Sequence, residues 1–296
     1  MIKSFFKEKH FEYQEEVSLK PYNTYRIDIK AKYIVFPKNK DELLEILKYL
    51  KQNKIKYLVL GNGSNIILTM SYYDGTIIKL DHLNNVNIHN DEIEVDAGCF
   101  LPKLSKQMAN SNLSGLEFAS GIPGQVGASI AMNAGAYNKD MASVVTSVTV
   151  INPRLEEEIL LPENLDFKYR SSFLKEHEDY IVIKATLKLT KGNKEEILNL
   201  MQDRQKRRLA TQPLEYPNSG SVFRNPKDNY AGSLIENCHL KNYHINDAYI
   251  SEKHANFIIN KGHATGKDIV NLIEYIQKEV KEKYNIDLIL EQKIIK

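Results

Sequence analysis

The sequence predicts an α+β protein of more than one domain. Short runs rich in β-branched residues alternate with longer segments of helical spacing. Prolines and a glycine interrupt this alternation between Pro213 and Gly220, which marks a domain boundary. The 296 residues suffice for two or three domains of ordinary size. We expect three, over residues 1–80, 81–210 and 211–296.

Helices and short strands are expected in the first part of the chain. Asp41–Leu50 has helical spacing, with Asp41 placed as its N-cap, and Pro102–Asn112 is expected to form a second helix. The runs expected to form strands are Lys56–Leu60, Ile66–Leu68, Thr76–Leu80, Glu92–Asp96, Val144–Ile151 and Tyr180–Leu189. The last of these alternates charged and apolar residues, as a half-buried strand does.

Helices dominate the rest of the chain. Lys194–Arg208 is amphipathic and ends in a basic cluster, which the helix dipole favours at a solvated helix end. The segment after residue 211 is expected to contain helices at Ala231–Cys238 and Thr265–Tyr284 and strands at Asn256–Asn260 and Ile286–Leu290. The long helix carries one apolar stripe that suits packing on a sheet.

Two glycine-rich segments point to a ligand. Gly61-Asn62-Gly63-Ser64-Asn65 lies between two expected strands, and Ser114–Tyr137 contains five glycines. Each glycine in a regular element costs roughly 0.5–1 kcal/mol against alanine, so such segments are typical of backbone that presents N–H groups to a ligand. Either segment alone is also consistent with a tight turn, but together they favour a large phosphate-bearing ligand.

Neither segment has the pattern of the commonest nucleotide-binding loops. Gly61 and Gly63 lack the third glycine and the following helix of the Rossmann pattern, and the sequence contains no Gly-Lys-Ser/Thr. The chain has no HExxH and no cluster of His and Cys at metal-ligand spacing, so we expect no metal.

Charge and cysteine usage narrow the class of protein. The 40 basic and 38 acidic residues give a net charge of +2, which makes no electrostatic case for nucleic acid or an anionic membrane. No apolar run approaches ~20 residues, and the first residues do not form a secretory signal. Cys99 and Cys238 are isolated, which is typical of reduced thiols, so we expect a cytoplasmic protein. No obligate protein partner is evident from the sequence.

Three short motifs are candidates for chemistry. Arg170 stands between aromatic residues and two serines, where a guanidinium is either an anion clamp or part of a surface turn. Ser221 follows Gly220 and exposes its hydroxyl at a turn, a position that more often holds a capping residue than a catalyst. Glu291 ends an apolar run, where a carboxylate either has a raised pKa or reaches solvent.

With these motifs assembled, the chain resembles the UDP-N-acetylenolpyruvoylglucosamine reductases, the flavoenzymes of peptidoglycan precursor synthesis. The resemblance runs from about Tyr22 to Ile295 and is to the shorter type, which lacks a substrate-covering tyrosine loop. The segments that carry it are Asn23–Arg26, Gly61–Asn65, Gly121–Tyr137, Tyr169–Phe173, Gln212–Pro217, Gly220–Pro226, Ser251–Ala255 and Glu291.

The resemblance implies a fold and a cofactor. It implies an FAD-binding fold of the vanillyl-alcohol-oxidase type in two subdomains, followed by an α+β substrate-binding domain. FAD would be bound non-covalently, because no His or Cys stands at an evident attachment site, and NADPH would be the co-substrate. The residues implied to hold the FAD pyrophosphate are Gly61, Asn62, Gly63, Ser64, Asn65, Ser120, Gly121 and Gly124.

The resemblance also implies a reaction, reduction of an enolpyruvyl ether of UDP-N-acetylglucosamine. Arg170 would stabilise the charge that develops on the substrate carboxylate, Glu291 would assist, and Ser221 would act as the general acid. The residues implied to contact substrate or cofactor are Tyr137, Tyr169, Arg224, Asn225 and His254.

The sequence departs from the family pattern at three places. Ile27-Asp28 stands where a Gly-Gly pair is usual, Thr211 where a lysine is usual, and Lys293 where an arginine is usual.

One alternative function is that of another FAD-dependent oxidoreductase of the same fold. The other is a nucleic-acid-binding module that uses the basic end of Lys194–Arg208, against which the near-zero net charge argues.

Overall fold

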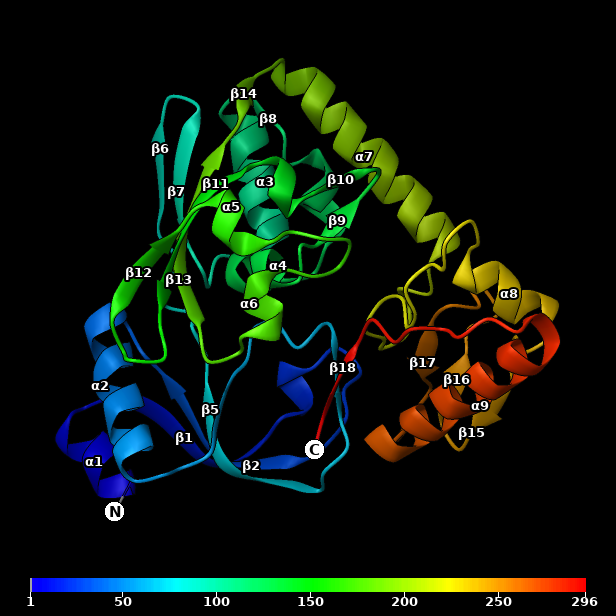
Figure 1. The fold of residues 1–296 in the computed structure, drawn as a ribbon, viewed down its shortest axis with the longest axis horizontal. Coiled ribbons are helices and arrows are strands. Elements are labelled where there is room, and N and C mark those ends of the chain that lie inside the picture. The colour runs from blue at the N-terminus through cyan, green and yellow to red at the C-terminus, as the bar shows by residue number, and fades with distance from the viewer. Residues whose placement is uncertain (1) are drawn as a thin grey trace. The chain divides into compact units, whose positions relative to one another are not determined.

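The computed structural model describes residues 2–296, which divide into two compact units (Figure 1). The first unit contains residues 2–15, 32–61 and 74–206, and the second contains residues 16–31, 62–73 and 207–296. Each unit therefore combines segments that are far apart in sequence. The division into three domains stays a prediction.

The first unit includes most of a four-stranded sheet and the helix α2. The strands are β1 (Glu12–Ser18), β2 (Lys30–Phe36), β5 (Tyr72–Ile78) and β3 (Tyr57–Val59), in the order β1-β2-β5-β3. Helix α1 (Ile2–Glu8) precedes the sheet, and α2 (Lys40–Gln52) follows β2. Asn39, rather than the predicted Asp41, caps α2: its extended backbone lets Oδ1 accept the N–H of Glu42, while Asp41 already lies in the first helical turn.

A five-stranded antiparallel sheet forms the larger part of the first unit. Its strands are β12 (Glu157–Leu160), β11 (Val145–Ile151), β13 (Ile181–Lys188), β7 (Glu92–Asp96) and β6 (Val86–His89), in that spatial order. Helix α4 (Val126–Ala131) contacts β13 and β7, and α3 (Leu101–Asn110) contributes Leu104 and Met108 to the same core. The strands predicted near 92–96, 144–151 and 180–189 are confirmed.

The glycine-rich segment folds into more regular structure than the sequence indicates. Residues Val126–Ala131 form α4, a helix that the sequence analysis did not predict. Gly127 lies inside it because a Cβ there would come within 2.9 Å of the Cβ of Ala97, so close packing outweighs the low helix propensity of glycine.

Short elements complete the first unit. They are β8 (Leu113–Ser114), β9 (Gly135–Ala136), β10 (Lys139–Asp140), α5 (Pro162–Leu165), α6 (Phe173–Glu176), β14 (Thr190–Lys191), and most of α7 (Lys194–Thr211). β8 pairs with β14, and β9 pairs with β10. Among residues 2–296, no helix is both long and apolar enough to cross a bilayer.

The second unit is built around the long helix α9 (Gly266–Tyr284). Its predicted apolar stripe is buried, and it contacts β15 (His244–Ile245) and β16 (Ala248–Ile250) of a small antiparallel sheet completed by β17 (Ile258–Asn260). Helix α8 (Ala231–Asn237) also contacts α9. Thr265 and Asp268 form a capping box at the start of α9.

A parallel strand pair in the second unit corrects one prediction. β4 (Ile66–Leu68) pairs with β18 (Lys293–Ile295), whereas the strand predicted at Ile286–Leu290 is wrong. Only Leu290 in that run makes a bridge, to Phe223. The rest of the run has no ladder partner, and the side-chain amide of Gln277 instead donates to the carbonyl of Leu288. The predicted order of strand, glycine turn and strand around Gly61 is confirmed by β3 and β4.

Candidate functional site

In the first unit, Gly61 lies against the start of α4. A Cβ on Gly61 would lie 3.2 Å from the Cβ of Ala128 and 3.4 Å from Oε1 of Gln125. A Cβ on Gly124 would lie 2.8 Å from Oγ of Ser129. The structure therefore brings one end of the first glycine loop next to the second glycine-rich segment, with the backbone of Gly61 lying against the side chains of Gln125 and Ala128.

Ser120 and Gly121 lie just before this meeting point. They belong to the 3₁₀ turn Glu117–Gly121, and both are half-buried. The hydroxyl of Ser120 donates to the carbonyl of Glu117 at 2.9 Å. This internal bond fixes the side chain of Ser120 and leaves its backbone as the part available to a ligand.

The rest of the first glycine loop belongs to the second unit and packs on the segment 22–25. Gly63 has a φ of +64°, and a Cβ there would lie 2.1 Å from the carbonyl oxygen of Tyr22. The N–H of Thr24 donates to the carbonyl of Gly63. Only glycine fits both the left-handed backbone and this contact. Asn62, Ser64 and Asn65 around it are half-buried and so remain accessible.

Ser221 and Glu291 lie on adjacent backbone segments in the second unit. The N–H of Glu291 donates to the carbonyl of Val222 at 2.8 Å, next to the bridge between Phe223 and Leu290. The Nε2 of Gln292 donates to the carbonyl of Ser221 at 3.3 Å. Two of the three predicted catalytic residues are thus brought together although they are far apart in sequence.

The same backbone network includes the first glycine loop. The side-chain amide of Asn65 donates to the carbonyl of Glu291 at 3.2 Å, and the N–H of Lys293 donates to the carbonyl of Asn65 at 2.9 Å. The hydroxyl of Tyr25, which is fully buried, donates to Oε1 of Gln292. Residues from four of the sequence motifs therefore share one network.

A cavity of about 330 Å³ lies beside Ser221. Its lining residues are Ser221, Asn225, Tyr230, Gly232, Ser233, Glu236, Lys253, His254, Ala255 and Asn256. Burial lowers the pKa of His254 below its ordinary value of 6.5. Its Nδ1 accepts the backbone N–H of Asn256 at 3.2 Å, which suits a neutral ring. The cavity is mainly polar and contains three predicted site residues.

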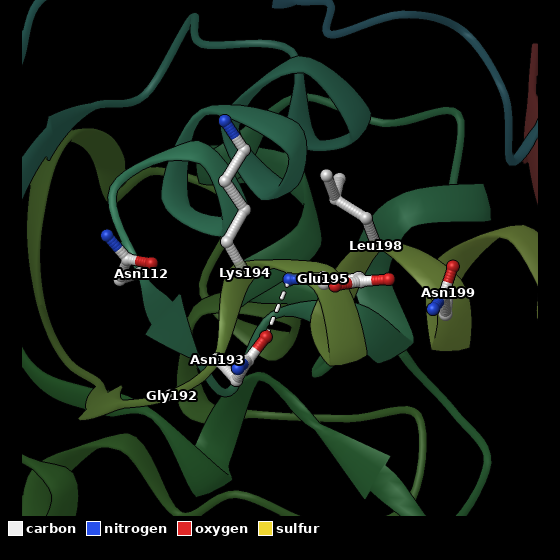
Figure 2. Close-up of a pocket in the computed structure, with 7 residues that line it drawn as sticks. All are labelled: Asn112, Gly192, Asn193, Lys194, Glu195, Leu198 and Asn199. Carbon is white, nitrogen blue, oxygen red and sulfur yellow. Dashed lines mark hydrogen bonds between the residues drawn. The ribbon is translucent and has the colours of Figure 1, made fainter.

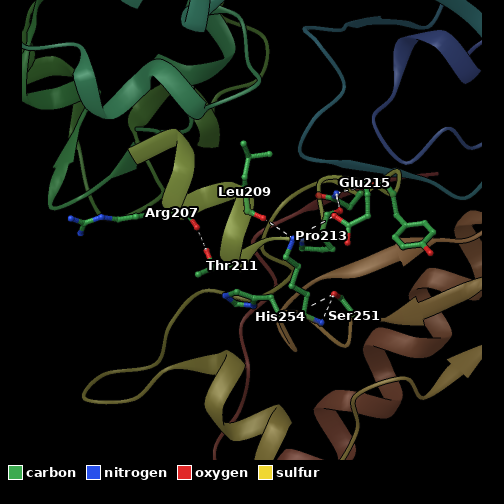
Figure 3. Close-up of polar contacts among 10 residues, drawn as sticks. Arg207, Leu209, Thr211, Pro213, Glu215, Ser251 and His254 are labelled. Atoms are coloured by element: carbon green, nitrogen blue, oxygen red, sulfur yellow. Dashed lines mark hydrogen bonds and ion pairs between the residues drawn. The ribbon is translucent and has the colours of Figure 1, made fainter. Parts of the chain in front are cut away.

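The turn before His254 faces the end of α7 (Figure 3). The hydroxyl of Ser251 accepts the N–H groups of Lys253 and His254. Nζ of Lys253 donates to the carbonyl of Leu209 at 2.6 Å, and Thr211 donates to the carbonyl of Arg207. The ammonium group of Lys253 is therefore held at the carbonyl two residues before Thr211, and it lies 3.6 Å from a carboxylate oxygen of Glu215.

Arg224 carries a polar atom that suits an anionic ligand. Its backbone N–H donates to the carbonyl of Ile289 at 2.9 Å, but its buried Nε has no hydrogen-bond partner within residues 2–296. Buried donors are nearly always satisfied, so an unsatisfied guanidinium N–H calls for an acceptor. The neighbouring Asn225 uses its Oδ1 to accept the N–H of Ala231 and lines the cavity.

Two buried amides in this unit, Asn256 and Gln292, were not among the predicted site residues. Asn256 binds one segment three times: its carbonyl accepts from Val222, its Oδ1 accepts from the N–H of Phe223, and its Nδ2 donates to the carbonyl of Phe223. Gln292 binds the turn that carries Ser221. Asn256 stands between Ala255 and Phe257, a pattern that favours a buried, hydrogen-bonded amide, whereas Gln292 stands between two charged residues and gives no such signal.

Arg170, Tyr169 and Tyr137 lie in the first unit. Nη2 of Arg170 donates to the carbonyl of Gly135 at 2.7 Å, and the guanidinium lies 5.0 Å from the ring centroid of Tyr169. Arg170 has a left-handed backbone with φ of +56°, and Nζ of Lys175 donates to its carbonyl. Such a conformation is uncommon for a non-glycine residue and is typical of functional turns.

Tyr137 is anchored to α7. Its hydroxyl donates to the carbonyl of Arg204 at 3.2 Å, and the guanidinium of Arg204 lies 4.5 Å from the ring centroid. Arg204 therefore belongs to a cation–π pair rather than to a purely solvated helix end. Because Tyr137 and Arg170 belong to the first unit, their participation in a site with Ser221 and Glu291 stays a prediction.

A wider hollow of about 690 Å³ lies elsewhere in the first unit (Figure 2). It is lined by Asn112, Gly192, Asn193, Lys194, Glu195, Leu198 and Asn199. Oδ1 of Asn193 accepts the N–H of Glu195, so this amide is used in starting α7. The hollow contains none of the predicted site residues, and the smaller cavity beside Ser221 is the better candidate.

Comparison with known proteins first defines the class. The family of FAD binding domains matches residues 31–155. A solvent-stable cholesterol oxidase shares the fold alone, with a TM-score of 0.50 at 14% identity over 62% of this chain and 38% of that one. The first unit is thus an FAD-binding fold of the oxidase type, as predicted, and the chain is an FAD-dependent oxidoreductase.

The particular family follows from longer matches. The C-terminal domain of UDP-N-acetylenolpyruvoylglucosamine reductase matches residues 212–295. The reductase of Caldanaerobacter subterraneus is 43% identical over 94% of this chain and 91% of that protein, and that of Lactobacillus acidophilus is 41% identical over 98% and 97%. The crystal structure of the Thermus caldophilus reductase has a TM-score of 0.81 at 32% identity, over 97% of this chain and 99% of that one. This chain belongs to the UDP-N-acetylenolpyruvoylglucosamine reductase family.

Proposed function

We propose that this chain reduces the enolpyruvyl ether of UDP-N-acetylglucosamine to UDP-N-acetylmuramate, with NADPH as the reductant, in peptidoglycan precursor synthesis. The observation that supports it most strongly is the backbone network that joins Ser221 to Glu291 beside a polar cavity. Because the network includes Asn65 of the first glycine loop, it connects residues proposed for chemistry with residues proposed for the cofactor.

The glycine-rich backbone fits FAD. At Gly61, Gly63 and Gly124, a Cβ would meet atoms at 3.2 Å or less, so the chain offers backbone at these positions. Backbone N–H groups are the usual donors to a pyrophosphate. The group proposed to hold it comprises Gly61, Asn62, Gly63, Ser64, Asn65, Ser120, Gly121 and Gly124. When bound, FAD supplies hydride transfer between NADPH and the substrate.

The proposed chemistry adds a hydride to the terminal vinyl carbon and a proton to the ether-bearing carbon. Before the proton arrives, the negative charge left by hydride addition spreads onto the adjacent carboxylate, where Arg170 and a protonated Glu291 are proposed to stabilise it. Ser221 is proposed to give its proton to the ether-bearing carbon, and water or a neighbour returns one to its oxygen. The hydroxyl is an adequate acid here because the intermediate is a strong carbon base.

Substrate binding is proposed for the polar groups around the cavity and in the first unit. The unsatisfied Nε of Arg224 suits a phosphate or carboxylate oxygen, and Asn225 and His254 line the cavity. Tyr137 and Tyr169 are proposed as contacts because both rings are about half exposed. A cytoplasmic location is part of the proposal, and the free thiols of Cys99 and Cys238 support it.

Rapid mixing of the two half-reactions tests the role of Ser221. We expect Ser221→Ala to leave flavin reduction by NADPH nearly unchanged and to slow reoxidation by the enolpyruvyl sugar nucleotide by about 10²-fold or more, the usual scale for a lost proton donor. Ser71→Ala, an exposed serine of the same unit, should change neither step. Equal losses in both half-reactions would contradict the proposed role.

A further inference from the structure

Lys79 is a buried cation that holds the first glycine loop. It follows β5, and only 4% of its surface is exposed. Its Nζ donates to the carbonyl of Gly61 at 2.6 Å and lies 3.3 Å from Oδ1 of Asp81. Burial lowers the pKa of Lys79 below its ordinary value of 10.5. The ammonium therefore reaches the loop at a cost in desolvation.

Asp81 extends this contact to the second glycine-rich segment. Its Oδ1 also accepts Nε2 of Gln125 at 2.6 Å, and Gln125 is the residue before α4. The Oε1 of Gln125 lies 3.4 Å from the Cβ position of Gly61. Lys79, Asp81 and Gln125, here called the polar bracket, therefore join Gly61 to the first turn of α4 through three side chains.

A second lysine–aspartate pair on the same sheet shows that the burial of Lys79 is unusual. Lys32 donates to Asp74 at 2.7 Å, but both side chains are largely exposed and this bond does not join a glycine loop. Exposed pairs of this kind contribute little to stability. Lys79 instead lies among Ile77, Ile78 and Leu80, all buried, where an apolar side chain would avoid the desolvation cost.

We propose that Lys79, Asp81 and Gln125 are positioning residues that hold Gly61 and the first turn of α4 in the arrangement that binds the FAD pyrophosphate. The inference rests on the proposed assignment of Gly61 and Gly124 to the cofactor. It assigns a role to three side chains that were not among the predicted site residues. In this role they act through the backbone that is proposed to bind the cofactor.

Titration of FAD into apoprotein, followed by flavin fluorescence, tests the polar bracket. We expect Lys79→Met to raise the FAD dissociation constant about tenfold or more, because it leaves the Gly61 carbonyl and Asp81 without their buried donor. Gln125→Leu should raise it by a smaller factor, since Lys79 still reaches Gly61. The matched control, Lys32→Met, removes the exposed pair and should bind FAD like the unmodified protein.

Thermal unfolding with and without FAD separates positioning from simple stability. A merely structural role would lower the apoprotein and holoprotein midpoints equally, whereas a positioning role also reduces the upward shift that FAD produces. If Lys79→Met does not fold, Gln125→Leu decides, because the Gln125 side chain makes no capping bond to α4. The inference would be overturned if the folded variants kept both the FAD affinity of the unmodified protein and its FAD-induced shift of the unfolding midpoint. An unmodified protein that binds no FAD would instead overturn the proposed function.

Discussion

The two ends of the first glycine loop are held by different means. Gly61, in the first unit, is held by the side chains of Lys79 and Gln125. Gly63, in the second unit, is held by backbone, against the carbonyl of Tyr22 and the N–H of Thr24. A contact that a side chain makes with backbone can adjust to substitution, whereas a contact between two backbone segments cannot. Sequence change should therefore be tolerated unequally at positions two residues apart.

The largest expected effect is at Gly63. Gly63→Ala combines a left-handed backbone, φ +64°, with a Cβ 2.1 Å from the Tyr22 oxygen. We expect a loss of more than about 3 kcal/mol in the free energy of unfolding, or no folded protein, measured by urea denaturation. Gly61→Ala would place its Cβ 3.2 Å from the Cβ of Ala128 and 3.4 Å from Oε1 of Gln125, both side-chain atoms, so we expect a loss of about 1 kcal/mol in the free energy of unfolding.

Gly220→Ala is the control that separates backbone strain from collision. Gly220 has a φ of +74°, but a Cβ there would meet nothing within 4 Å. The expected loss in the free energy of unfolding is therefore about 1 kcal/mol, which is the cost of a left-handed backbone for alanine. Equal losses at Gly61 and Gly63 would show that the two ends of the loop are not held differently.

A smaller effect is expected at Asn256, where a side chain holds backbone. Asn256→Ala would leave both the N–H and the carbonyl of Phe223 without their partner. We expect a loss of about 2–3 kcal/mol by urea denaturation, because unsatisfied buried groups cost about 1–3 kcal/mol each. Asn84→Ala, which removes one exposed amide, should cost little. A loss at Asn256 no greater than at Asn84 would contradict this account.

The smallest effect is a pH dependence at His254. Because its pKa is lowered in the folded state, the unfolded state binds more protons as the pH falls through 6.5. The contribution of His254 to the free energy of unfolding should therefore decrease as the pH falls from 6.5 to the lowered pKa. Below that pKa it should stay constant. His254→Gln should flatten that part of the stability profile, measured by thermal unfolding across the pH range. An unchanged profile would show that His254 is not the group responsible.

Local patterns predicted most of the elements, and their failures have local causes. The apolar stripe of α9 and the alternation in β13 are periodic over many residues, so both are read from the sequence alone. Helix α4 was missed because its glycine is required by packing on Ala97, which is 30 positions away. The strand predicted at Ile286–Leu290 was wrong because a run of apolar residues does not reveal whether a partner strand exists.

Part of the candidate site could also be predicted from local patterns, and part could not. Ser221 and Glu291 belong to recognisable motifs, and the structure brings them together. Asn256, Gln292 and Lys79 were not predicted, because each acts by a hydrogen bond to backbone that is distant in sequence. Composition and spacing describe which side chains a segment carries, but not which carbonyl they will meet.

The parallel pairing of β4 with β18 has a consequence for biosynthesis. Thr69, next to β4, binds the carbonyl of Ile295, 226 positions further along the chain. A ribosome therefore releases the apolar run Ile66-Ile67-Leu68 long before its hydrogen-bonding neighbour is translated. We expect nascent chains halted near residue 250 to expose this run and to be retained by holdase chaperones, until the final strand arrives and completes the second unit.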